Sequence, residues 1–150
     1  MIEIKKTVIV PFTPKQMFEI VNDIETYPNY LPWCSSTKIQ DQTEDLLVGS
    51  IYLEYLKVKT HFTTRNKNTP YSHIDVQLVD GPFKELSGTW NFKALGENGC
   101  KIEFSLNYKF TNSLFEKIIG PVFEYITKNI VECFIKEAHI RHGSNIISKS

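Results

Sequence analysis

Apolar and polar residues alternate along much of this 150-residue chain between residues 36 and 110. In the last such run every second residue is apolar: Ile102, Phe104, Leu106, Tyr108 and Phe110. Successive side chains of a β-strand point to opposite faces, so each run predicts a strand with one buried and one hydrated face. Strands of this kind are typical of antiparallel sheets with one covered side. The region therefore predicts about six antiparallel strands that share one apolar face.

The residues before this region predict one further strand and a capped helix. The strand is expected over residues 2–10. Thr13 suits the N-cap of the following helix and Pro14 its first position. Gln16 is placed to bond back to the cap, as in a capping box. We expect this helix to run to about Asn22.

Proline and glycine positions mark the remaining connections. A second short helical stretch is expected over residues 24–31, broken around Pro28 and Pro32. Glu97-Asn98-Gly99 predicts a hairpin, because Asn-Gly tolerates the positive φ angles that a type I′ turn requires. Asp80-Gly81-Pro82 marks another connection between strands.

After residue 112 the apolar spacing changes to the 3.6-residue period of a helix. The predicted stripe comprises Phe115, Ile119, Val122, Ile126, Ile130 and Cys133, widened by Ile118, Phe123 and Phe134. Pro121 interrupts this pattern, so we expect either a kink there or a short helix that ends at Gly120 before a long one. Gly143 is the expected C-terminal stop, and the tail beyond it is expected to fray.

The helix and the sheet each have one apolar face, and each has only the other to cover it. We therefore predict a single α+β domain over residues 1–150, in which a curved antiparallel sheet of about seven strands surrounds a long C-terminal helix. Ten Phe, seven Tyr and two Trp supply wide, rigid walls for its interior. A large sheet curls as it twists, and this leaves room for a cavity between sheet and helix.

Composition excludes several classes of function. A formal net charge of zero argues against broad nucleic-acid binding and against a DNA partner, although a local basic patch stays open. Three distant cysteines indicate neither a disulfide framework nor a zinc site. The start of the chain shows no signal peptide or presequence, and no apolar run approaches a membrane span. A soluble, cytoplasmic protein is therefore expected.

The sequence also lacks recognisable catalytic motifs. It has no nucleophile elbow and no Gly-rich phosphate loop. His139 and His142 have the i,i+3 spacing of a shared metal site, but we favour a role as last-turn residues that complement the helix dipole. Nothing near Cys34 in sequence lowers the pKa of its thiol, so we interpret it as a small apolar residue. No catalytic or metal-binding residue is predicted.

Five sequence blocks occur in an order and spacing that resemble a known family. They are YPNYLPWC at 27–34, TTRN at 63–66, VDGPFK at 79–84, GTWNF at 88–92 and CKIEF at 100–104. Together they are similar to the coenzyme Q-binding protein and ribosome-association toxin (RatA) family of the START/polyketide-cyclase-like superfamily. The resemblance covers the chain up to about Gly143. It implies a helix-grip (START-like) fold with a tunnel between the sheet and the C-terminal helix.

The resemblance implies three different functions. Mitochondrial members are linked to coenzyme Q binding and respiration, a bacterial member to blocking ribosomal subunit association, and many members are labelled oligoketide cyclases. We favour a carrier or chaperone for a polyprenylated quinone, with bound ubiquinone or another isoprenoid lipid and no required cofactor. A toxin that binds the large ribosomal subunit is the alternative. A polyketide cyclase-like enzyme is third, because it needs an acid or base beyond the inward-facing Thr60, Thr64 and Tyr108.

The expected ligand-binding residues combine a block near the cavity mouth with inward positions of the sheet and the helix. They are Tyr30, Leu31, Trp33, Phe62, Thr64, Phe83, Trp90, Phe104, Val122, Phe123 and Ile126. Residues 30–33 are expected to form a lid in which Trp33 stacks on the ligand, and Phe83 is expected in a loop. Each residue alone is also explained as ordinary core, so the hypothesis depends on the set.

A basic stripe forms the second candidate site. It comprises Lys57, Lys59, Arg65 and Lys67, with His61 among them. These residues occupy odd positions along one predicted strand and therefore project together. The stripe suits anionic lipid headgroups, as in peripheral contact with the inner membrane, or ribosomal RNA phosphates. The alternative is a hydrated face that Glu54 and Asp75 partly neutralise.

Overall fold

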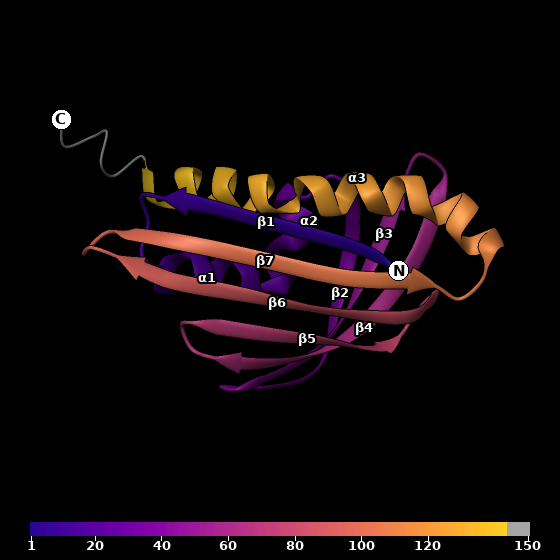
Figure 1. Cartoon of the computed structure of the whole chain (residues 1–150), viewed down its shortest axis with the longest axis horizontal. Helices are drawn as coiled ribbons and strands as arrows, with labels where there is room; N and C mark the ends of the chain where they lie inside the picture. The colour runs from indigo at the N-terminus through magenta and orange to yellow at the C-terminus, as the bar shows by residue number, and fades with distance from the viewer. Residues whose placement is uncertain (144–150) are drawn as a thin grey trace.

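Seven antiparallel strands form one open sheet in the computed structural model, which describes residues 1–143 (Figure 1). In chain order they are β1 (Ile2–Val10), β2 (Cys34–Thr43), β3 (Leu46–Tyr55), β4 (Val58–Thr69), β5 (His73–Asp80), β6 (Phe83–Leu95) and β7 (Gly99–Phe110). In space the order is β1-β7-β6-β5-β4-β3-β2. The first strand thus pairs with the last one, and β2 forms the opposite edge. The predicted strand number and antiparallel arrangement are confirmed.

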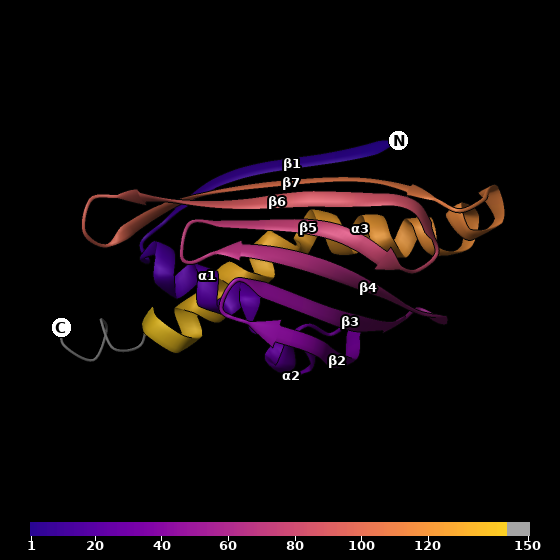
Figure 2. The ribbon, with the colours of Figure 1, turned by 90° about the horizontal axis from the view of Figure 1, so that it is seen from below.

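Helices cover one face of this sheet. They are α1 (Pro14–Asn22), the 3₁₀ turn η1 (Ile24–Thr26), α2 (Tyr27–Tyr30), α3 (Ser113–Ala138) and the π-helical turn η2 (His139–Gly143). α3 lies along the concave side, and the strands curve around it (Figure 2). No helix among residues 1–143 is both long and apolar enough to cross a bilayer. The predicted frayed tail lies outside the described residues.

The alternating inward residues of β7 form a continuous part of the buried core. Its inward residues are all buried: Cys100, Ile102, Phe104, Leu106, Tyr108 and Phe110. Trp90 of β6 lies opposite Phe104 in the register, and their ring centroids are 4.2 Å apart. Phe134 of α3 meets the same Trp90 at 5.6 Å, so the helix and the sheet share one aromatic core. Register shifts in the β2–β3, β4–β5 and β6–β7 pairings bend the strands and add to the curvature.

The N-terminal elements follow the local sequence signals. Thr13 Oγ1 accepts a hydrogen bond from the Gln16 N–H at 3.1 Å, and the Thr13 N–H donates to Gln16 Oε1 at 2.9 Å. The predicted capping box is thus confirmed, with Pro14 in the first turn. The second helical stretch is also confirmed, as η1 followed directly by α2. These elements carry the chain from β1 at one edge of the sheet to β2 at the other.

The start of α3 differs from the predicted stripe. The helix continues through Pro121 without a break, and its first turns are inclined to the rest (Figure 1). Phe115 and Ile118 were expected to face inward, but they are 38% and 55% exposed. The first turns of α3 extend toward the end of the sheet (Figures 1 and 2), and Phe115 and Ile118 line an open groove beside residues 57–61.

Two hairpin turns also differ from expectation. The β6–β7 hairpin is present, as predicted. The type I′ turn predicted at Asn98-Gly99 is wrong, because the residue with a positive φ angle is Gly96 (66°) and Gly99 is already the first residue of β7. The two-residue turn occurs instead between β3 and β4, where Leu56 and Lys57 have φ angles of 48° and 69°. The pairing of Tyr55 with Val58 leaves only two residues to connect these strands, which forces this geometry.

Replacing Thr13 with alanine tests the capping box. Thr13→Ala removes the side-chain acceptor of the Gln16 N–H but keeps the backbone N–H that donates to Gln16 Oε1, so the free energy of unfolding should fall by about 1 kcal/mol. Urea denaturation followed by circular dichroism measures this change. Glu19→Ala, at an exposed position of the same helix, is the control and should change stability by less than about 0.5 kcal/mol. Equal effects of the two substitutions would contradict the capping role.

Candidate functional site

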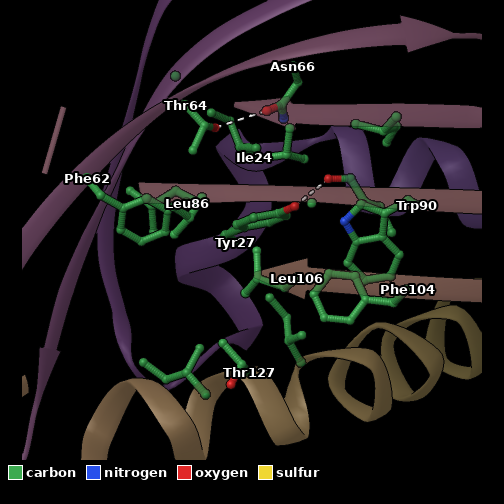
Figure 3. Close-up of a pocket in the computed structure, with 18 of the residues that line it drawn as sticks. Ile24, Tyr27, Phe62, Thr64, Asn66, Leu86, Trp90, Phe104, Leu106 and Thr127 are labelled. Atoms are coloured by element: carbon green, nitrogen blue, oxygen red, sulfur yellow. Dashed lines mark hydrogen bonds between the residues drawn. The ribbon is translucent and has the colours of Figure 1, made fainter. Parts of the chain in front are cut away.

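A cavity of about 110 Å³ lies between the concave face of the sheet and α3 (Figure 3). Its sheet walls come from inward positions of β3 to β7, including Leu86 and Leu106. α3 closes one side, and Val21, Ile24 and Tyr27 of the N-terminal helical segment close another. Most of this lining is aliphatic or aromatic. The sheet and the helices therefore surround a mainly apolar space suited to a hydrophobic molecule.

Most of the predicted ligand-binding residues meet at this cavity. Seven line it: Trp33, Phe62, Thr64, Trp90, Phe104, Phe123 and Ile126. They come from five separate segments of the chain, namely the turn before β2, β4, β6, β7 and α3, so only the fold brings them together. Leu31 and Val122 are buried but do not line the cavity, and neither Tyr30 nor Phe83 does. A role in binding stays a prediction for the seven.

Of residues 30–33, which were expected to form a lid, only Trp33 reaches the cavity, and it is part of the wall. Leu31 and Trp33 are 1% and 2% exposed, so neither is available as a surface flap. The Leu31 N–H closes α2 by donating to Tyr27 O, and the Cys34 N–H donates to Leu31 O. This turn directs Trp33 inward against the cavity. Tyr30 packs outside it, with the Arg141 guanidinium 5.8 Å from its ring centroid.

Phe83 was expected in a loop, and the structure places it in a strand instead. It is the first residue of β6 and is only 5% exposed. Its ring centroid lies 4.9 Å from that of Phe123, 5.0 Å from that of Phe110 and 6.0 Å from that of Phe62. These partners come from α3, β7 and β4. Phe83 therefore backs the cavity wall from outside, while the neighbouring Lys84 is exposed.

Few polar side chains reach the cavity. Thr64 Oγ1 donates a hydrogen bond to Asn66 Oδ1 at 3.0 Å, and Thr127 Oγ1 donates to the Glu124 carbonyl at 3.1 Å. Figure 3 shows the Thr64–Asn66 pair across the cavity from Thr127. The Tyr27 hydroxyl donates to Val21 O, and burial raises the pKa of Tyr27 well above its usual value. Tyr27 is therefore a neutral hydrogen-bonding group.

The cavity lining, as far as residues 1–143 show, contains no carboxylate, imidazole or amine. Of the three polar residues considered for a cyclase, only Thr64 lines the cavity, since Thr60 and Tyr108 lie elsewhere. An uncharged hydroxyl is a poor general acid or base near neutral pH. The arrangement is suited to holding a molecule rather than to moving its protons.

Sequence reasoning missed several lining residues. Asn66 and Thr127 are the most informative, because they bring polar groups to an otherwise apolar space. The signal for Asn66 was present, since residues 62, 64 and 66 share one face of β4. Thr127 sits within the buried face of α3 next to Ile126, where a polar residue did not fit the apolar stripe.

The basic stripe is exposed along its whole length, although its members are not all on β4. Lys59, His61, Arg65 and Lys67 project from the outer face of that strand, whereas Lys57 lies in the β3–β4 turn. Glu54 is opposite Lys59 in the register and Asp75 opposite Lys67, as the neutralising arrangement requires. No ion pair within 4 Å involves Lys57, Lys59, Arg65 or Lys67 in the described part of the chain. Binding at the stripe stays a prediction.

The histidines considered as a possible metal site pack against an aromatic side chain. The rings of His139 and His142 lie 4.9 and 6.2 Å from Phe12, and no cluster of three metal-ligating side chains occurs within residues 1–143. The three cysteines are unpaired thiols. Burial raises the pKa of the Cys34 thiol to about 11, in agreement with its interpretation as a small apolar residue.

Residues 10–135 match the model of the polyketide cyclase / dehydrase and lipid transport family. The ribosome association toxin RatA of Escherichia coli K12 is 38% identical over 136 residues, which cover 91% of this chain and 86% of the toxin. The mitochondrial coenzyme Q-binding protein COQ10 homolog B of Xenopus laevis is 23% identical, over 95% of this chain and 60% of that protein. The resemblance to RatA toxins and to coenzyme Q-binding proteins, which the sequence blocks indicated, is thus confirmed.

A solved structure confirms the expected helix-grip architecture. The Zhui aromatase/cyclase of Streptomyces sp. R1128 superposes with a TM-score of 0.79 over 95% of this chain and 97% of the enzyme. Their sequences are only 16% identical, so this likeness concerns the fold.

Burial of the thiols predicts slow alkylation in the folded state. With the pKa of both Cys34 and Cys100 raised to about 11, few thiolates exist at mildly alkaline pH, and the thiolate is the nucleophile. Iodoacetamide labelling followed by peptide mass spectrometry should show both residues reacting far more slowly in native protein than in denaturant. Rapid labelling of either residue with an unchanged circular dichroism spectrum would contradict this burial.

Proposed function

Because this chain belongs to the polyketide cyclase / dehydrase and lipid transport family, we propose that it is a carrier or chaperone that holds a hydrophobic ligand between its sheet and α3. The favoured ligand is a polyprenylated quinone such as coenzyme Q. The observation that carries this proposal is the enclosed apolar cavity with one polar pair, Thr64 and Asn66, in its wall. The name of the coenzyme Q-binding relative supports the same ligand class.

The size of the cavity limits what it holds without rearrangement. At about 110 Å³ it is comparable to an engineered protein cavity of about 150 Å³ that binds benzene. A quinone ring is therefore similar in size to the cavity, whereas a long prenyl chain fits only if the walls separate. Burial of that chain contributes roughly 25 cal/mol per Å², which is the source of free energy for such widening.

The polar pair gives the ligand an orientation. Asn66 accepts the Thr64 hydrogen bond through Oδ1, which leaves its Nδ2 donors for a ligand oxygen. A quinone carbonyl accepts but does not donate, so it matches this side chain. The aromatic rings of Trp33, Trp90 and Phe104 supply flat apolar surfaces around a ring or an isoprenoid chain.

Cavity filling tests the carrier function. Ile126→Phe adds volume from α3 into the cavity, so uptake of a short-chain ubiquinone should fall by at least about tenfold. Native mass spectrometry of protein incubated with the quinone, together with organic extraction of protein from its own host, measures bound ligand. The matched control is Val122→Ile, which enlarges a buried α3 residue away from the cavity and should leave uptake unchanged.

Two results would contradict the proposal. The first is wild-type protein that emerges empty from its host and takes up no added quinone. The second is equal uptake by Ile126→Phe and wild-type protein, with both folded by circular dichroism, since ligand would then bind elsewhere.

A ribosome-directed function is the second candidate, and two specific observations favour it. The curated relatives at 30 to 38% identity include proteins named ribosome association toxin RatA. The basic stripe on the outer face of β4 supplies exposed cations for RNA phosphates. In this function the stripe, rather than the cavity, carries the activity, and the large ribosomal subunit is the partner.

Charge removal on β4 tests the ribosomal candidate. If the stripe binds RNA, Arg65→Gln with Lys67→Gln should weaken co-sedimentation with purified large subunits by at least about fivefold, and added salt should weaken wild-type binding steeply. Lys101→Gln with Lys136→Gln removes the same charge from β7 and α3 and serves as the control. Equal loss with both pairs, or no salt dependence, would argue against specific recognition by the stripe.

A further inference from the structure

Exposed apolar side chains gather at one end of the molecule. Leu56 in the β3–β4 turn is 75% exposed, and Leu114, Phe115 and Ile118 at the start of α3 are 61%, 38% and 55% exposed. Both elements lie at the same end of the sheet, together with the β5–β6 connection (Figure 2). Side chains of this size are normally scattered singly on a surface, so a cluster from separate elements points to an interaction.

Leu56 occupies an unfavourable backbone position for its residue type. Its φ angle of 48° lies in the left-handed region, where Asn and Gly are preferred over leucine. The turn thus presents an apolar tip to water at a position that a polar residue fits better. Its neighbour Lys57, also at positive φ, places a cation directly beside that tip.

A groove at this end of the molecule is lined by both apolar side chains and lysines. It has a volume of about 680 Å³ and lies between residues 57–61, residues 80–82 and the start of α3, with Lys57, Lys59, Phe115 and Ile118 among its walls. A neighbouring concavity contains Lys84 and Lys109 and shares Thr111 with the groove. The acidic walls are Asp80 in the groove and Glu116 in the concavity. Within residues 1–143 none of the four lysines forms an ion pair.

Only a thin wall separates this groove from the internal cavity. Gly81 lines the groove, and a Cβ atom at Gly81 would lie 2.7 Å from the Cβ of Phe62, which lines the cavity. Phe83 and Phe123 complete the wall, with ring centroids 6.0 and 5.9 Å from that of Phe62. The same end of the molecule therefore combines the exposed apolar side chains with a thin barrier to the cavity.

We propose that this end docks on an anionic lipid bilayer, with Leu56, Phe115 and Ile118 entering the boundary between headgroups and acyl chains. Lys57, Lys59, Lys84 and Lys109 then meet lipid phosphates. Apolar tips ringed by lysines match an interfacial membrane site. An RNA surface accounts for the lysines but leaves the aliphatic tips in water, so the bilayer explains both features. The docking surface goes beyond ligand binding, because it requires no occupant in the cavity.

Vesicle flotation tests the docking surface with ligand-free full-length protein. The vesicles contain equal parts phosphatidylglycerol and phosphatidylcholine, and pure phosphatidylcholine vesicles serve as the uncharged comparison. Wild-type protein should float with the anionic vesicles. Leu56→Asn with Ile118→Gln should lower the partition coefficient by at least about tenfold, because two apolar side chains no longer enter the bilayer. Asn also suits the left-handed turn, so loss of binding is not explained by unfolding.

The matched control places the same substitutions at the opposite end of the molecule. Leu95→Asn with Ile140→Gln changes exposed apolar residues of the β6–β7 hairpin and of η2, and flotation should remain at the wild-type level. Lys57→Gln with Lys59→Gln should reduce flotation with anionic vesicles and make the remaining binding less sensitive to lipid charge, because Lys84 and Lys109 still contribute. These outcomes are independent of quinone uptake, which is measured without vesicles.

Three results would overturn the proposal. The first is the absence of wild-type flotation with anionic vesicles. The second is equal loss with the two apolar pairs, which would show no preference for this end. The third is loss on lysine substitution but full binding by Leu56→Asn with Ile118→Gln, which would show a purely electrostatic surface of the kind that nucleic acid uses.

Discussion

The mutual burial of α3 and the concave face of the sheet is the interaction on which the rest of the structure depends. Each of these elements has one apolar face, and burial of a large apolar side chain contributes about 1.5 to 3 kcal/mol. Phe134 against Trp90, and Phe123 against Phe83 and Tyr108, show how aromatic residues of the helix interlock with β6 and β7. A straight helix does not fill a curved sheet completely. The cavity is the space left between the two shapes, and its position follows from the curvature.

The two ends of the cavity are closed by different kinds of residues, and the proposed functions depend on this difference. The N-terminal helical segment closes one side with Ile24, Tyr27 and the buried Trp33. On the other side the aromatic wall around Phe62 separates the cavity from a basic, partly apolar groove. In the proposed docking, a hydrophobic ligand that leaves a bilayer would meet this groove first. The proposed ligand site and the proposed docking surface are thus adjacent in space, although each is tested separately.

A formal net charge of zero conceals an uneven distribution of charge. Lys67 on the outer face of β4 is opposite Asp75, and Lys59 is opposite Glu54, so that face resembles an ordinary hydrated surface as well as a binding site. The lysines at the groove end differ because they surround exposed aliphatic side chains. The combination of lysines with exposed aliphatic side chains, rather than positive charge alone, distinguishes a binding site for lipid from one for nucleic acid. Lys57 and Lys59 belong to both candidate surfaces, whereas Arg65 and Lys67 belong to the ribosomal one alone and the exposed aliphatic side chains to the lipid one alone.

Local patterns in the sequence determined the strands, the capping box at Thr13 and the amphipathic helix, because alternation, helical periodicity and capping involve residues close together in the chain. They also identified Phe62, Thr64, Trp90 and Phe104 as inward-facing, since the face of a strand residue follows from its parity. Only the tertiary structure decided that Phe83 is buried, that Ile118 is exposed and that the tight turn falls at Leu56. Phe83 is covered by residues from three distant elements, Ile118 lines an open groove, and the turn follows from the register of β3 with β4. A cavity or a docking surface is a relation between the shapes of separate elements, so no stretch of sequence contains it.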